Sequence, residues 1–397
     1  MMQVVALPGG RAASYEVIGG GTPTLMFAGG PGFSAAYMNG DAELLSDVLC
    51  SYLIDPHGSG SSTPPADAAH YSPEGHARFY EQVREALALL EVVVLGHSFG
   101  ATTALTYAAL FPQSAAMCVA VAAFGIGPDA DAQQGGEAEA EAEAVLARHA
   151  GSPWYEAARP VVDSWTERLL AATDAAEMEQ MMATVLPFYV AEPDKPEVAA
   201  RLAKMNAAMK ANLAAGHAWE AGLYQSVDLR PLLGRITCPT LIVAGELDFI
   251  CGPAQAQPIA AAITGAQLVM LPACGHIPSI ETPSTTAARS RNSSAAEPRG
   301  NSRSQPTRQH GMLAAYRQPG NRSGNIQPCR DEVMGSDPVA GSGPANQLRS
   351  DIGLEYHHRR QLIQDLRIPG DLVLAEMAGH SDKGAACQRG DLDIHPG

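Results

Sequence analysis

A serine, an aspartate and a histidine occur in loops after predicted strands, and these residue types together can activate a hydroxyl nucleophile. Ser98 lies in the stretch GHSFG, Asp248 in GELD and His276 in CGH. A serine hydroxyl is a weak nucleophile at neutral pH, so it needs a base within hydrogen-bond reach and an acid that fixes the tautomer of that base. We therefore predict Ser98 as the nucleophile, His276 as the base and Asp248 as the acid.

Each of these roles has a rival in the sequence. Asp248 could cap the helix that follows, with Glu246 as the acid, but Asp248 lies farther along the loop and can reach across to the histidine. His276 could be an ordinary loop histidine, and His380 is the runner-up base. His97 adjoins the nucleophile, but at such a turn we expect its side chain to point away from the serine hydroxyl.

Attack on a carbonyl carbon creates an oxyanion, which needs two preorganised N–H donors. The residue after the nucleophile, Phe99, can give one backbone N–H. The turn GGPG at residues 29–32 can give the other, and we predict the N–H of Gly30, because small residues let a backbone approach closely. The alternative is a simple tight turn without this role.

The elements around Ser98 are those that a nucleophile elbow requires. The apolar run Val92–Leu95 is typical of a strand buried on both faces of a parallel sheet, and the Ala-rich run Ala101–Leu110 is typical of a helix. A sharp turn bounded by Gly96 and Gly100 joins them, as in the pattern Gly-x-Ser-x-Gly. This order predicts that the serine hydroxyl stands above the sheet at the start of a helix.

The chain divides into four predicted parts. Strand and helix patterns alternate over residues 1–127 and again over 230–283, which predicts an α/β core with a mostly parallel sheet and helices on both faces. Residues 128–229 lack strand patterns and are predicted to form an inserted helical cap. Residues 284–397 are rich in Ser, Gly and Arg and are predicted to be a low-complexity tail.

Composition and charge exclude several classes of function. The net charge of −16 argues against a nucleic-acid-binding protein, and no stretch is long and apolar enough to span a bilayer. The seven cysteines form no Cys-x-x-Cys pair, and no secretory signal is visible. We therefore expect a cytoplasmic protein with a small-molecule or short-peptide substrate and without a metal or organic cofactor. The oligomeric state stays open.

Taken in order, the stretches AGGPG, DPHGSGSS, GHSFG, GELD and CGH resemble the α/β-hydrolase superfamily, most closely its proline iminopeptidase-like branch, the prolyl aminopeptidases. The resemblance covers about residues 1–283 and implies the α/β-hydrolase fold with a helical cap. The chain departs from that branch at three places. Ala28 replaces a histidine, His57 replaces an arginine, and the elbow reads GHSFG where the aminopeptidases have GGSWG.

The resemblance also bears on substrate. It implies that Glu220, in the segment Ala218-Trp219-Glu220, contacts the free amino group of a substrate, although Glu220 could equally be a surface residue of the cap. No second amine-binding glutamate is evident. We therefore expect an aminopeptidase acting on small peptides or amino-acid amides. A carboxylesterase or lactonase and a non-catalytic binding relative are the alternatives.

The end of the chain departs from the family pattern. The resemblance implies a last helix soon after His276, but beyond Pro283 the sequence becomes Ser- and Arg-rich. We interpret this change as a native end displaced by a frame shift or a fused sequence.

Overall fold

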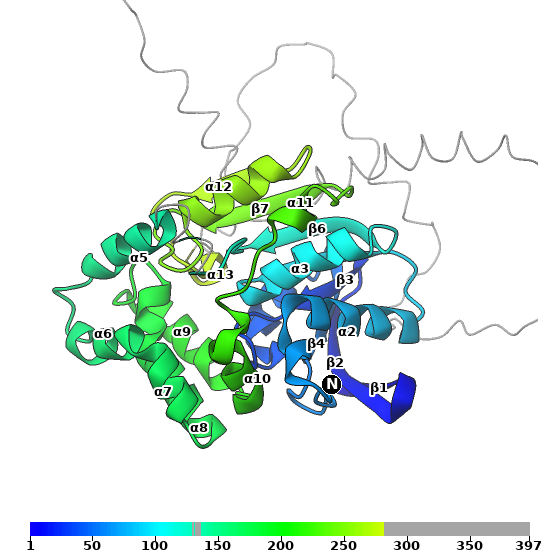
Figure 1. Cartoon of the computed structure of the whole chain (residues 1–397), viewed down its shortest axis with the longest axis horizontal. Helices are drawn as coiled ribbons and strands as arrows, with labels where there is room; N and C mark the ends of the chain where they lie inside the picture. Colours follow the sequence, from blue (N-terminus) through cyan, green and yellow to red (C-terminus); the bar gives the residue numbers. More distant parts are fainter. Residues whose placement is uncertain (129–130, 132–135, 282–397) are drawn as a thin grey trace, which may run out of the picture. The chain divides into compact units, whose positions relative to one another are not determined.

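The computed structural model describes residues 1–128, 131 and 136–281 (Figure 1). The predicted tail, with the alternative base His380, lies outside the described residues. All the described residues belong to one compact unit.

An eight-stranded sheet forms the centre of the described fold, in the order β1-β2-β4-β3-β5-β6-β7-β8. Strand β2 pairs antiparallel with β1 and with β4, and the remaining neighbours pair in parallel. The mostly parallel sheet predicted from the sequence is thereby confirmed. The strands are β1 (Gln3–Leu7), β2 (Arg11–Gly19), β3 (Thr22–Phe27), β4 (Leu49–Ile54), β5 (Val92–His97), β6 (Ala115–Val121), β7 (Thr240–Gly245) and β8 (Gln267–Leu271).

Both faces of the sheet are buried. On β5, Val92 and Val94 belong to one apolar cluster while Val93 and Leu95 belong to another, because successive side chains of a strand point to opposite faces. All four are buried, as the continuous apolar run predicts for a central parallel strand. Helices α2 and α3 lie side by side over the first of these clusters (Figure 1).

The helices of the core follow the predicted alternation with the strands. They are the 3-10 turns η1 (Pro8–Gly10), η2 (Ala35–Met38) and η3 (Ala68–Tyr71), and the helices α1 (Asn39–Leu44), α2 (Pro73–Ala86), α3 (Phe99–Leu110), α11 (Arg230–Leu233), α12 (Pro253–Ala262) and α13 (Pro278–Glu281). Ser72 caps α2, since its hydroxyl accepts from the N–H of Gly75. The apolar spacing of residues 73–90 predicts a helix up to Leu90, but α2 ends at Ala86, and Ala88 takes a positive φ.

Between β6 and β7 the described residues form helices and no strand. We call the helices between residues 137 and 223 the helical insertion; they gather together in green in Figure 1. They are α5 (Glu137–Ala147), α6 (Tyr155–Asp163), α7 (Trp165–Ala171), α8 (Ala175–Val185), η4 (Leu186–Tyr189), α9 (Pro196–Ala208), α10 (Leu213–Ala218) and the π-turn η5 (Trp219–Leu223). Among all the described helices, none offers an apolar stretch long enough to cross a bilayer.

Candidate active site

Ser98 sits at the sharp turn between β5 and α3. Its backbone has φ 57° and ψ −127°, a conformation that a residue with a side chain adopts only under tertiary constraint. The turn requires glycine at both flanking positions, because a Cβ at either one would clash with neighbouring backbone atoms. A Cβ on Gly96 would lie 2.2 Å from the carbonyl oxygen of Gly100, and one on Gly100 would lie 2.0 Å from that of Phe27. The elbow therefore holds the half-buried Ser98 at the N-terminus of α3.

His276 and Asp248 form a buried hydrogen-bonded pair. His276 Nδ1 lies 2.8 Å from Asp248 Oδ2, and both residues are 1% exposed. The other carboxylate oxygen, Oδ1, accepts from the N–H groups of Ile250 and Cys251 at 2.8 and 2.9 Å. Burial alone would raise the pKa of Asp248, but His276 and these amides together hold it below its ordinary value. The carboxylate is thus ionised and oriented to fix the Nδ1–H tautomer of the histidine.

The loop that carries His276 leaves its second ring nitrogen available. His276 N–H donates to the carbonyl of Tyr189 at 2.7 Å, and Nε2 is buried with no hydrogen-bond partner among the described residues. Ser98 Oγ and His276 Nε2 are not hydrogen-bonded to each other here, and catalytic contacts of this kind commonly tighten on substrate binding. The rival acid Glu246 is exposed.

The predicted oxyanion donors are both free. The N–H groups of Gly30 and Phe99 donate to no described residue, and both residues line one cavity with Ser98. Gly30 has φ +60°, a conformation that favours glycine, and a Cβ there would meet the ring of Phe33 at 2.5 Å. The N–H of Gly29 is engaged instead, because it donates to the hydroxyl of Tyr37 at 2.5 Å.

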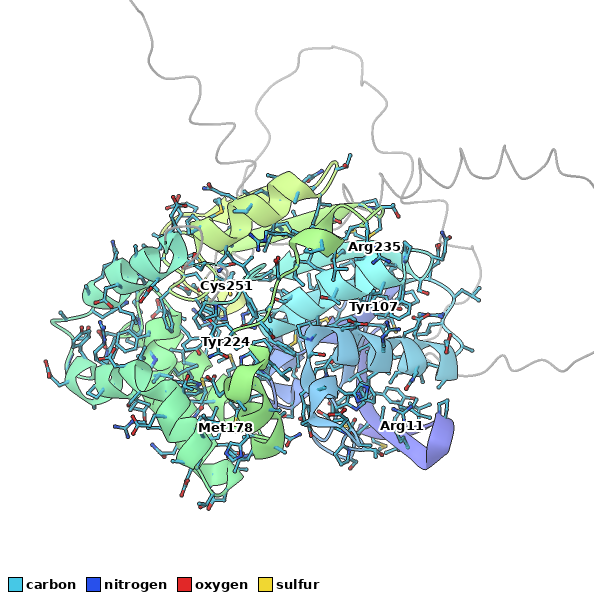
Figure 2. All side chains as sticks on the ribbon, in the orientation of Figure 1. Arg11, Tyr107, Met178, Tyr224, Arg235 and Cys251 are labelled. Carbon is cyan, nitrogen blue, oxygen red and sulfur yellow. The ribbon has the colours of Figure 1, made fainter. Side chains whose placement is uncertain are left out.

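Ser98 opens into a cavity of about 230 Å³ between the sheet edge and the helical insertion. Two of its wall residues, Met178 and Tyr224, are labelled in Figure 2. The wall is largely aromatic and aliphatic, and Glu220 is the one charged side chain that the described residues contribute to it. A cavity of this kind encloses a small substrate and orients it through few polar contacts.

Glu220 is 7% exposed and held by two donors. Its Oε1 accepts from Trp165 Nε1 at 3.1 Å and its Oε2 accepts from the hydroxyl of Thr166 at 2.6 Å. Burial raises the pKa of the Glu220 carboxyl, and these two hydrogen bonds oppose that rise. The side chain is therefore fixed in the cavity wall, and the alternative of an exposed cap glutamate does not describe its position.

The acid–base pair also belongs to a set of three potential metal ligands. Asp248, Cys251 and His276 place one ligand atom each within 4.8 Å of one another. The donor set fits a metal poorly. Asp248 already accepts three hydrogen bonds, and burial holds the pKa of the Cys251 thiol well above its usual value, whereas metals bind the thiolate.

A larger cavity, of about 390 Å³, lies elsewhere, between η2, α1, α9 and α13. It adjoins Tyr37 and His97 but does not contain Ser98 or Glu220. We therefore take the smaller cavity as the candidate active site.

Sequence reasoning missed several contacts that shape this site. Tyr37 contacts the turn at residues 29–32 that carries the predicted donor Gly30, which we call the oxyanion loop. Trp165 and Thr166 hold Glu220 from a helix 54 or 55 residues away in the chain. These contacts are formed by tertiary packing between separate elements. The sequence offers no local pattern that would have identified them.

Comparison with known proteins identifies the family. The family model described as "alpha/beta hydrolase fold" matches residues 22–283. The structure is similar to that of an alpha/beta fold family hydrolase from Bacillus anthracis str. Sterne, with a TM-score of 0.57, 17% identity, and coverage of 74% of this chain and 98% of that one.

Two curated relatives are both proline iminopeptidases. The protein from Heyndrickxia coagulans is 36% identical over 111 residues, which are 28% of this chain and 38% of the relative. The protein from Chitinophaga pinensis is 33% identical over 87 residues, which are 21% of this chain and 29% of the relative. The match thus spans well under half the length of either relative. The chain belongs to the alpha/beta hydrolase fold family.

Proposed function

We propose that this α/β-hydrolase is a serine hydrolase that forms an acyl-enzyme on Ser98 and cleaves small peptides or amino-acid amides with a free N-terminal amine. The observation that carries the proposal is the buried hydrogen-bonded pair of His276 and Asp248. His276 Nε2 has no partner among the described residues, and Ser98 occupies a nucleophile elbow. Partial similarity to two proline iminopeptidases supports the choice of substrate class.

Acylation would use Ser98 as nucleophile, His276 as base and Asp248 as the acid that orients the base. Ser98 Oγ attacks the acyl carbon while His276 Nε2 takes the hydroxyl proton, and the ionised Asp248 stabilises the resulting imidazolium. The oxygen that gains negative charge accepts from the free N–H groups of Gly30 and Phe99, at the N-terminus of α3. His276 then gives its proton to the leaving amine, which departs as the bond to the acyl carbon breaks.

Deacylation repeats the same steps with water. A water molecule loses a proton to His276 Nε2 and attacks the acyl carbon, the same two amides hold the oxyanion, and Ser98 regains its proton as the acid product leaves. The cavity wall around the acyl group is largely apolar. Low polarity around the reacting centre strengthens each of these electrostatic contacts.

Glu220 provides the argument for an amine-bearing substrate. An ammonium group bound in the cavity would find one carboxylate, already oriented by Trp165 and Thr166. A charge-assisted hydrogen bond to a buried carboxylate is stronger than a neutral one, and it would also offset the burial of Glu220. This contact would place the first residue of the substrate with its carbonyl toward Ser98.

A small carboxylic ester or lactone is the second candidate substrate. Apart from Glu220, the described residues that line the cavity are uncharged, and such a wall suits an uncharged substrate. A non-catalytic binding relative would keep the same cavity without turnover.

Paired hydrolysis assays separate these candidates. A proline arylamide with a free amine and a short-chain aryl ester are tested with the wild-type chain, Ser98→Ala and Glu220→Gln. Arylamide turnover that disappears in Ser98→Ala and falls in Glu220→Gln supports the aminopeptidase. Ester turnover alone, unchanged in Glu220→Gln, moves the assignment to an esterase. No turnover of either substrate by the folded wild-type chain favours the binding relative.

A further inference from the structure

Two side chains outside the proposed triad, Tyr37 and His97, link the oxyanion loop to the loop that carries His276. Tyr37, in η2, accepts the N–H of Gly29 at 2.5 Å, and its hydroxyl lies 3.0 Å from His97 Nδ1. His97, the last residue of β5, has its other ring nitrogen 2.9 Å from the carbonyl oxygen of His276. A continuous chain of hydrogen bonds therefore runs from the oxyanion loop to the backbone of the proposed base.

The direction of every bond in this chain is determined by its ends. The His276 carbonyl can only accept, so His97 Nε2 must carry a proton. Burial lowers the pKa of His97 to about 3, so the ring is neutral and its Nδ1 must accept. The donor to Nδ1 is then the hydroxyl of Tyr37, which burial keeps protonated by raising its pKa, and the phenolic oxygen accepts from Gly29. None of these hydrogen bonds can reverse its donor and acceptor without leaving a neighbouring group unsatisfied.

We propose that Tyr37 and His97 are positioning residues, which hold the oxyanion loop and the His276 loop in a fixed relation across Ser98. The inference rests on the proposed function, since it assigns these two residues to the same acyl-transfer site. They act through the backbone of Gly29 and His276.

The packing around Gly29 shows how closely this relation is set. A Cβ on Gly29 would lie 2.5 Å from the carbonyl oxygen of His97, 2.7 Å from the hydroxyl of Tyr37 and 2.9 Å from Ser98 Cβ. Because the N–H of Gly29 is used by Tyr37, the neighbouring N–H of Gly30 is the one left to an oxyanion. A small shift of this loop would move that donor away from Ser98, and misplacement of catalytic groups by about 1 Å can cost about a hundredfold in rate.

The test interrupts this series of hydrogen bonds at Tyr37 and at His97 separately. Tyr37→Phe keeps the ring and removes the hydroxyl, while His97→Phe replaces the imidazole with a ring that cannot form hydrogen bonds. We expect kcat to fall between about tenfold and a hundredfold in each, with KM changed by less than about twofold. The double variant should lose no more than the worse single variant, because either change breaks the whole chain.

Two further variants separate positioning from general destabilisation. His97→Gln keeps a side-chain N–H that can donate to the His276 carbonyl, and it should recover part of the kcat lost in His97→Phe. Tyr107, labelled in Figure 2, has a hydroxyl that donates to Glu81 and does not line the cavity. Tyr107→Phe removes this hydroxyl and should leave kcat unchanged. Equal losses in Tyr107→Phe and Tyr37→Phe, or full activity in Tyr37→Phe and His97→Phe, would overturn the proposal.

A spectroscopic reading of the folded chain does not depend on activity. Nitrogen NMR of histidine-labelled protein should show His97 as the neutral Nε2–H tautomer in the wild type, with an altered Nδ1 signal in Tyr37→Phe. An Nδ1–H tautomer or a charged ring would overturn the hydrogen-bond chain even if the enzyme is active. A wild type inactive on both substrates would overturn the proposed function, while the tautomer still decides whether the chain of bonds exists.

Discussion

Acidification should destabilise this fold through the buried His57 and His76 and the half-buried His97. Burial lowers the pKa of His57 to about 4 and those of His76 and His97 to about 3, against an ordinary value near 6.5. These rings stay neutral in the folded chain while they gain protons in the unfolded chain. The stability is therefore fully present above about pH 6.5 and is lost as the pH falls toward 4 and then 3.

The size of the effect follows from these values. Between about pH 7.5 and pH 5.5 each histidine costs about 1.4 kcal/mol, so the three together cost about 4 kcal/mol. Asp41 opposes this loss, because burial raises its pKa to about 6 and its protonation in the folded chain returns about 1 kcal/mol. Glu220 and Glu281, whose pKa values burial also raises, act in the same direction. The net loss is thus about 3 kcal/mol at most, a large part of the stability of a typical domain.

Urea unfolding at the two pH values measures this loss, and one variant identifies its source. Both ring nitrogens of His76 lack a hydrogen-bond partner among the described residues, so His76→Phe keeps the ring packing and removes one titrating group. The variant should lose about 1.4 kcal/mol less than the wild type on acidification. The control Ile259→Val, at a buried side chain of α12, should lower stability equally at both pH values. A pH dependence that is absent in the wild type, or identical in His76→Phe, would refute the reasoning.

Three further substitutions test the site. Asp248→Asn should lower kcat by about 10³- to 10⁴-fold, with the fold intact by circular dichroism, because an amide favours the wrong tautomer of His276. Gly29→Ala should lower both kcat and the melting temperature, since its Cβ would lie 2.9 Å from Ser98 Cβ; an active, equally stable variant would contradict the close packing. Glu281→Ala should reduce kcat, because this carboxylate accepts from the N–H of Gly275, next to His276, at 2.7 Å and from the N–H of Ala191 at 2.8 Å. Unchanged steady-state kinetics would argue against this role.

The sequence predicted the parts of the fold that local patterns encode. The apolar run of β5, the glycines of the elbow and the alternation of strands with helices each depend on residues close together in the chain, and the structure confirms them. The sequence also predicts a helix over residues 35–48, and that helix is only partly formed. It begins as the 3-10 turn η2 and ends as α1 at Leu44, four residues short of the predicted end. Gly40 lies within this stretch and weakens a regular helix.

The supporting contacts of the site could not be predicted, for a physical reason. The sequence predicts that the side chain of His97 points away from the serine hydroxyl. In the structure the His97 ring is hydrogen-bonded to Tyr37 and to the His276 carbonyl. Which partners it would meet depends on how η2 and the base loop pack against β5. The hydrogen bonds of Trp165 and Thr166 to Glu220 likewise join separate helices of the insertion. Such contacts leave no periodic trace in the sequence.

The central claim is that Ser98 is a nucleophile activated by His276, and covalent labelling tests it most directly. The folded wild-type chain is treated with a fluorophosphonate, and the adduct is located by peptide mass spectrometry. We expect one adduct, on Ser98, which is absent in Ser98→Ala and forms much more slowly in His276→Ala. An adduct of the same rate and yield in Ser98→Ala, or no adduct on the folded wild-type chain, would contradict the account.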